Sequence, residues 1–203
     1  MNIIVYGLLF VLMILTVHTK IHVYTKALMS FGFLFVLLQS SHQDYMWIML
    51  PAILACLIGD VILKMRKEKY FLYGLGAFLA GNILFVYYFS HFQSIQVTTL
   101  ILTMCIMPVF SLLEYVLKIE FKTLRIPVYM YAFMISFALS SSIMTYVMIE
   151  TPMFLLSMIG FILYFISDII LLFHMFVKPS KVLGFCNLAC YYVGMFLIVY
   201  SIF

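Results

Sequence analysis

Long apolar segments separated by short polar breaks fill this chain, and that pattern restricts the fold more than any other feature of the sequence. A helix that crosses the hydrocarbon core of a bilayer needs about 20 predominantly apolar residues. Eight segments of about that length use up nearly all of the 203 residues and leave no room for a soluble domain. We therefore predict an all-α polytopic membrane protein that forms a single transmembrane domain. The eight segments are residues 1–18, 23–40, 45–64, 70–90, 95–117, 126–148, 152–176 and 182–202.

The composition excludes an ordinary soluble protein, because hydrophobic residues make up 67% of the chain and charged residues only 9%. Soluble domains carry about 45–50% apolar and about 25% charged residues. The net charge of +4 gives no reason to expect nucleic acid as a partner. The four cysteines lie inside apolar segments without the spacing of a metal site, so we predict that they are small core residues and hold no metal.

Basic residues occur in every second break, and this alternation predicts an orientation. Of the 11 lysines and arginines, ten lie in the first, third, fifth and seventh breaks, and Lys26 lies just inside the second segment. Short loops rich in Lys and Arg remain in the cytosol. We therefore expect the odd-numbered loops to be cytosolic and both termini to face the other side, in the plasma membrane if the protein is bacterial. The ten residues are Lys20, Lys64, Arg66, Lys67, Lys69, Lys118, Lys122, Arg125, Lys178 and Lys181.

Three acidic residues lie inside the apolar segments. Asp60, Glu114 and Asp168 precede basic breaks by four to ten residues, which places them in the predicted cytosolic half. A charged side chain near the bilayer centre costs about 2.5–3.5 kcal/mol on insertion scales, so such residues face the bundle interior or a wet cavity. We expect Asp60 and Asp168 to converge on one cavity. The alternative is a structural role, in which Lys26 or the surroundings neutralise each acid.

Two asparagines are the other strongly polar residues of the segments. Asn82 lies near the middle of the fourth segment, and Asn187 lies six residues after Lys181. Each either forms hydrogen bonds between helices, which is common in membrane bundles, or belongs to the site.

A short similarity between two segments suggests an internal repeat. Residues 56–65, CLIGDVILKM, resemble residues 164–173, YFISDIILLF, and the two aspartates are 108 positions apart. We predict a duplication of four plus four helices, over residues 1–93 and 94–203.

Several short motifs, taken in their order and spacing, match a known pattern. Gly59-Asp60-Val-Ile-Leu63 ends the third segment, Phe78-Leu-Ala-Gly81 lies in the fourth, and Gly160 precedes Ser167-Asp168 in the seventh. Lys26 and a tyrosine in the last segment, Tyr191 or Tyr192, also match. Over almost its whole length the chain resembles the lysoplasmalogenase (YhhN-like) family of eight-helix membrane proteins. Family members tend to have Gly-His and then a Tyr three residues later, where this chain has Gly81-Asn82 and Phe85.

The resemblance implies hydrolysis of the vinyl ether of a lysoplasmalogen, which gives a fatty aldehyde and a glycerophosphoethanolamine or glycerophosphocholine. It implies that Asp60 and Asp168 are the catalytic pair. Vinyl ethers resist base but yield to acid, so the reaction needs one protonated carboxyl and one carboxylate, and no cofactor. The sequence leaves open which aspartate is the acid and which is the carboxylate. Asp168 is favoured as the acid, because it lies further from its basic break than Asp60 does and so lies deeper in the membrane. The residues that we predict to bind substrate are Lys26, Asn82, Glu114, Ser167, Asn187 and Tyr191.

Two other functions are compatible with the same pattern. A small transporter or lipid-handling protein could use the acids to bind protons or a cation. A structural membrane protein could use them only to hold its helices together. The sequence specifies neither the lipid headgroup nor the oligomeric state.

Overall fold

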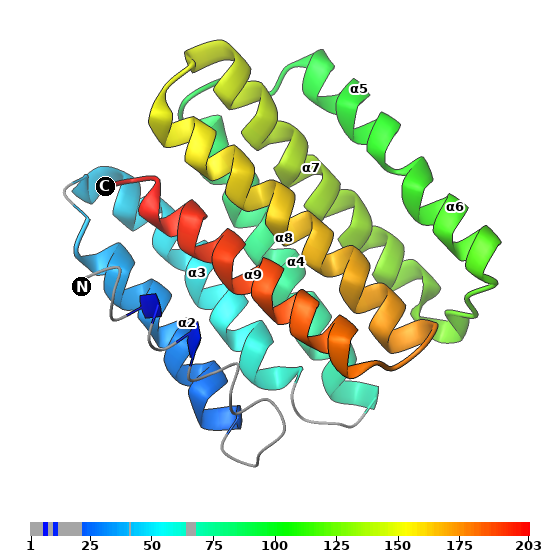
Figure 1. Ribbon diagram of the computed structural model, residues 1–203. Helices are drawn as coiled ribbons and strands as arrows, with labels where there is room; N and C mark the ends of the chain where they lie inside the picture. The colour runs from blue at the N-terminus through cyan, green and yellow to red at the C-terminus, as the bar shows by residue number, and fades with distance from the viewer. Residues whose placement is uncertain (1–5, 8–9, 12–21, 41, 64–67) are drawn as a thin grey trace.

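The chain folds into a bundle of helices (Figure 1). The computed structural model describes all residues except 1–5, 8–9, 12–21, 41 and 64–67, and the described residues contain no β-strand. The helices are α2 (His22–Leu38), α3 (Gln43–Ile62), α4 (Glu68–Ser90), α5 (Val97–Ile106), α6 (Pro108–Leu117), α7 (Arg125–Ile149), α8 (Pro152–Phe176) and α9 (Lys181–Tyr200), with a 3₁₀ turn, η1, at Lys122–Leu124.

Six of the described spans are long and apolar enough to cross a membrane, so the protein is a multi-pass membrane protein. These spans are Gln43–Ile62, Tyr70–Ser90, Val97–Leu117, Arg125–Ile149, Pro152–Phe176 and Lys181–Tyr200. With the shorter α2, the described residues account for seven of the eight predicted segments.

The first predicted segment, 1–18, lies mostly outside the described residues. Its described residue Tyr6 is helical, stacks on Phe196 of α9 at 4.4 Å between ring centroids, and donates a hydrogen bond to the Tyr192 carbonyl oxygen at 3.2 Å. This part of the first segment therefore packs against the last helix.

The fifth predicted segment is divided rather than continuous. The helix ends at Ile106 and resumes at Pro108, which takes the first position of α6. Proline lacks the N–H that a continuous helix would use and its ring clashes with the preceding turn, which explains the break. In Figure 1, α5 and α6 form the outer edge of the bundle. Phe110 of α6 packs against Phe165 of α8, at 5.6 Å between centroids.

Glycines allow two helix pairs to approach closely. A Cβ atom on Gly160 of α8 would lie 2.7 Å from the carbonyl oxygen of Gly194 in α9, and one on Gly59 of α3 would lie 2.7 Å from the ring of Phe78 in α4. In lipid, where apolar surface alone gives little driving force, such small residues permit the close packing that holds helices together.

The two ends of the bundle differ in charge. We call the end where α3, α6 and α8 finish and α4, α7 and α9 begin the basic end, because the third, fifth and seventh breaks occur there in the sequence. The opposite end carries the α2–α3 connection and the chain's last residues, which are joined by a hydrogen bond from Ser40 Oγ to the Ile202 carbonyl oxygen at 2.7 Å.

Candidate active site

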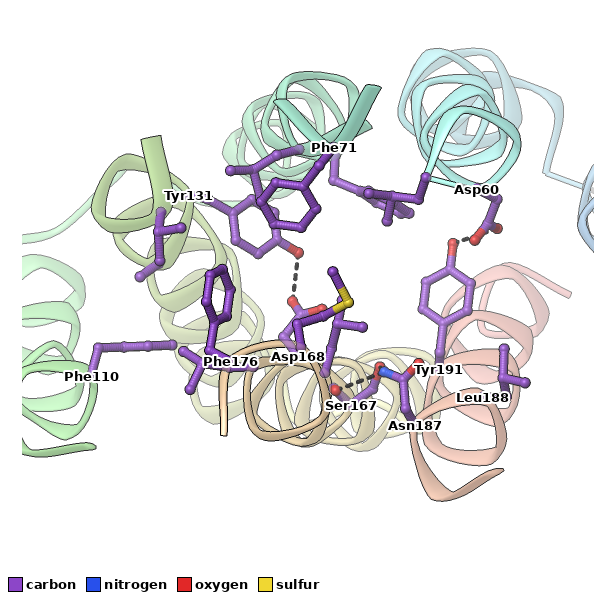
Figure 2. A pocket seen from close by; sticks show the side chains of 18 residues that line it. Asp60, Phe71, Phe110, Tyr131, Ser167, Asp168, Phe176, Asn187, Leu188 and Tyr191 are labelled. Carbon is purple, nitrogen blue, oxygen red and sulfur yellow. Dashed lines mark hydrogen bonds between the residues drawn. The ribbon is translucent and has the colours of Figure 1, made fainter. Parts of the chain in front are cut away.

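A cavity of about 280 Å³ lies within the half of the bundle nearest the basic end. Both Asp60 and Asp168 line it, as expected from the sequence, together with four other polar residues and an apolar wall (Figure 2). One lining residue, Met175, is 49% exposed, so the cavity reaches the outer surface of α8. The polar residues are Asp60, Tyr131, Ser167, Asp168, Asn187 and Tyr191; the wall is Leu63, Phe71, Leu75, Phe78, Phe110, Val128, Ala132, Leu171, Leu172, Met175, Phe176 and Leu188.

Asp60 lies in the last turn of α3 and is 4% exposed. Its Oδ2 atom accepts hydrogen bonds from Ser30 Oγ of α2 and from the Tyr191 hydroxyl of α9, each at 2.9 Å. Ser30 Oγ also lies 3.2 Å from the Tyr192 hydroxyl. The carboxyl group is therefore fixed in orientation by side chains from two neighbouring helices.

Asp168 lies two turns before the end of α8 and is less buried than Asp60. The Tyr131 hydroxyl of α7 donates a hydrogen bond to its Oδ2 atom at 2.5 Å. The same tyrosine hydroxyl lies 3.5 Å from the hydroxyl of Tyr164, which is fully buried one turn before Asp168. This carboxyl group is open to the cavity and held on one side by a phenol.

A set of tyrosines joins the two aspartates. The rings of Tyr164 and Tyr191 are 5.6 Å apart between centroids, and their partners Tyr131 and Asp60 lie on either side. Figure 2 shows Tyr131 directed at Asp168 and Tyr191 directed at Asp60. Each acid thus faces the cavity beside a phenol, and the two acids are held by different helices.

Asn187 of α9 and Ser167 of α8 form a third polar feature. Asn187 Nδ2 donates to the Ser167 carbonyl oxygen at 2.8 Å and to Ser167 Oγ at 3.1 Å. Both bonds come from the amide nitrogen, and among the described residues no hydrogen bond uses its carbonyl oxygen. The amide therefore offers an acceptor to the cavity in a fixed position.

Two other predicted site residues, Glu114 and Asn82, do not line the cavity. Glu114 lies near the basic end, as predicted, but belongs to a separate surface cluster. Its Oε1 atom lies 3.1 Å from Arg125 Nε, and its Oε2 atom accepts a hydrogen bond from the Tyr129 hydroxyl at 2.5 Å. Asn82 is fully buried in α4. Lys26 belongs to α2, but its side chain lies outside the described part of the structure.

Sequence reasoning missed two site residues, Tyr131 and Ser30. Tyr131 follows Arg125 by six residues, a spacing that places it at a depth similar to that of Asp168. Ser30 follows Lys26 by four residues and so shares its helix face. The sequence therefore indicated how deep these residues lie in the membrane, but not the direction in which each side chain points.

The described residues contain no group of three or more His, Cys, Asp and Glu side chains arranged to hold a metal ion. The chemistry available in the cavity is that of two carboxyl groups, two phenols, a serine and an amide among apolar walls.

The fold and the site together define a multi-pass helical membrane protein with a pair of acids in an interior cavity. The chain belongs to the YhhN family, whose sequence model matches residues 21–202, and this family includes lysoplasmalogenases. The predicted family resemblance is thereby confirmed. Comparisons with curated proteins and with solved structures gave no match.

Proposed function

We propose that the protein hydrolyses the vinyl ether bond of lysoplasmalogens. The observation that carries this proposal is the presence of Asp60 and Asp168 in one largely apolar cavity. Membership of the YhhN family supports a reaction of this class. A vinyl ether requires acid at its β-carbon and stabilisation of the resulting cation, and two carboxyl groups can divide these tasks as they do in glycosidases.

The proposed reaction begins with proton transfer from a carboxylic acid to the β-carbon, which leaves an oxocarbenium cation. A water molecule then adds to the cationic carbon and gives its proton to the carboxylate. The resulting hemiacetal breaks its carbon–oxygen bond and passes its hydroxyl proton to the departing glycerol oxygen. The products are a fatty aldehyde and a glycerophospho-alcohol, one water molecule is consumed, and the proton taken up by the second carboxyl returns to the first before the next turnover.

We assign the acid to Asp168 and the carboxylate to Asp60. Asp168 is the less buried of the two, so a carbon atom of a substrate in the cavity can approach it. Asp60 is held by two hydroxyl donors, which suits a carboxylate that must stay in place while a cation forms nearby. Tyr131 and Tyr191 would act as positioning residues for the two acids.

The lining suggests how a lysolipid binds. Its aliphatic chain would lie along the phenylalanine and leucine side chains of the wall. The glycerol hydroxyl is suited to the carbonyl oxygen of Asn187, which Ser167 holds in place. Lys26 remains our prediction as the ligand of the phosphate.

We also propose that the cavity faces the cytosolic leaflet. The lining comes from the helix turns next to the breaks that contain Lys and Arg, and short basic loops remain in the cytosol. Labelling of single cysteines in the 91–96 and 178–181 loops of whole cells, with a reagent that does not cross membranes, tests this orientation. We expect labelling in the first loop only; labelling in the second loop alone would reverse the assignment.

The direct test is aldehyde release by the purified protein from a lysoplasmalogen in detergent. We expect release by the wild type and its loss in Asp60→Asn and in Asp168→Asn. Ser136→Ala is a matched control, because Ser136 is a buried polar residue whose hydroxyl, among the described residues, bonds to the carbonyl of Ala132 in its own helix. Absence of aldehyde from the wild type, or release from both aspartate variants that is unchanged from the wild type, would refute the proposal. Proton or cation flux into liposomes without aldehyde would favour the transporter instead.

A further inference from the structure

Asn82 of α4 is the least satisfied polar side chain next to the active-site cavity. It is 0% exposed, and neither its Nδ2 nor its Oδ1 atom has a hydrogen-bond partner among the described residues. An amide has two donors and an acceptor that it must satisfy, and buried polar groups in proteins are nearly always paired with protein atoms or with ordered water. The surroundings of Asn82 therefore have to supply a partner that the described part of the chain does not.

The packing of α4 against α8 fixes where Asn82 lies. Phe161 of α8 contacts Phe85 and Phe89 of α4, at 5.1 and 5.4 Å between ring centroids, and Phe154 contacts Phe92, just after the end of α4, at 4.8 Å, so the two helices run antiparallel. Three residues before Phe85 is Asn82, and three residues after Phe161 is Tyr164. Asn82 is thus level with Tyr164, one turn below Asp168.

Asn82 also continues the face of α4 that lines the cavity. Phe78 is part of the cavity wall, and Asn82 follows it by four residues, a spacing that places both on one side of a helix. Neighbouring Gly81 lies against α3, where an added Cβ atom would be 2.9 Å from Cys56 Sγ. The amide therefore lies one turn beyond the cavity wall, on a helix that packs against α3 and α7 and contacts α8 through Phe85.

The chemistry of this place fits water better than an ion or an organic group. An uncharged amide supplies donors and an acceptor but no charge, and a buried water molecule needs about three polar partners. Asn82 supplies both kinds of group, and Tyr164, whose hydroxyl lies 3.5 Å from that of Tyr131, is at the same level of the bundle. We propose that Asn82 binds a buried water molecule that forms the deep end of the active site.

This water site has a direct use in the reaction, a role that rests on the proposed function. Hydrolysis consumes a water molecule after the cation forms, while the lipid chain fills the apolar cavity and keeps bulk water away. A water held beside Tyr164 is one turn from Asp168, on the side of that carboxyl away from the basic end. Asn82 then acts as a positioning residue for the second substrate.

Hydroxyl-radical labelling by brief X-ray irradiation, read by mass spectrometry, tests for the water in the purified protein. Bound water produces radicals where it sits, and Cys56 is only 1% exposed, so oxidation of Cys56 reports a neighbouring buried water. We expect oxidation in the wild type, its loss in Asn82→Leu, and its retention in Asn82→Ser and in Ser136→Ala. An unlabelled Cys56 in the wild type, or labelling that persists in Asn82→Leu, would overturn the proposal.

Aldehyde release gives the second readout. We expect Asn82→Leu to lower kcat on the order of 100-fold with little change in KM, and Asn82→Ser to restore most of it, because a displaced reactant of this kind costs about that factor. A rise in KM alone would show that Asn82 touches the lipid instead and would overturn the water role. If the wild type releases no aldehyde but Cys56 labelling depends on Asn82, the proposed function fails while the water site stands.

Discussion

The close contact between α8 and α9 makes the sharpest prediction about how packing supports the site. A Cβ atom on Gly160 would lie 2.7 Å from the Gly194 carbonyl oxygen and 3.0 Å from the Ile198 backbone nitrogen, while ordinary contacts begin at 3.4 Å. The neighbouring atoms include backbone, so no side-chain rotation alone can relieve the clash. Gly160→Ala must therefore move the two helices apart by about 0.7 Å, the difference between the 3.4 Å of an ordinary contact and the 2.7 Å available.

The magnitude follows from two opposing effects. Overpacking of this kind costs about 1–3 kcal/mol, and alanine in place of glycine returns about 0.5–1 kcal/mol inside a helix. We expect a net loss of about 1–2 kcal/mol of stability. Because Asn187 and Tyr191 of α9 reach across to Ser167 and Asp60, separation of the helices should also lower aldehyde release.

Gly76→Ala is the matched control, since an added Cβ atom there meets nothing within 4 Å. Thermal unfolding and aldehyde release are measured separately in detergent. Gly76→Ala should have an unchanged or slightly higher Tm, and Gly160→Ala should have a lower Tm and a lower rate of aldehyde release. The double variant Gly160→Ala, Gly194→Ala should lose less stability than the sum of the losses in the two single variants, because both substitutions open the same contact. Equal Tm and equal rates for Gly160→Ala and Gly76→Ala would refute the reasoning.

Three further predictions concern single side chains. Tyr131→Phe and Tyr191→Phe each remove a hydroxyl donor to a catalytic aspartate. The rate constant of aldehyde formation in single-turnover assays should therefore fall while Tm stays within a few degrees. An unchanged rate constant in both variants would remove the tyrosines from the mechanism. Asn187→Leu should raise KM for a lysoplasmalogen but not for an analogue without the glycerol hydroxyl, and an equal effect on both substrates would contradict the proposed contact. Glu114→Gln should leave aldehyde release unchanged and cost less than about 1 kcal/mol, because the partner Arg125 is 66% exposed; lost activity would return Glu114 to the site.

Much of the architecture followed from the sequence alone. The spacing of polar breaks predicted the membrane spans, and in the described residues seven of the eight segments are helices near the expected positions. The one internal difference, the break between α5 and α6, occurs at Pro108, whose chemistry is visible in the sequence. The orientation and the internal repeat stay predictions.

The sequence also determined the depth of the site, and the tertiary structure decided which residues share it. Each residue of a helix adds a fixed 1.5 Å along the axis, so distance from a basic break places Asp60 and Asp168 in the same half of the bundle. The direction of a side chain around its helix is different, because helices that are apolar on every side carry no stripe that marks an inner face. Only packing revealed that Tyr131 and Ser30 hold the acids, that Glu114 pairs with Arg125 outside the cavity, and that Asn82 lies beneath it.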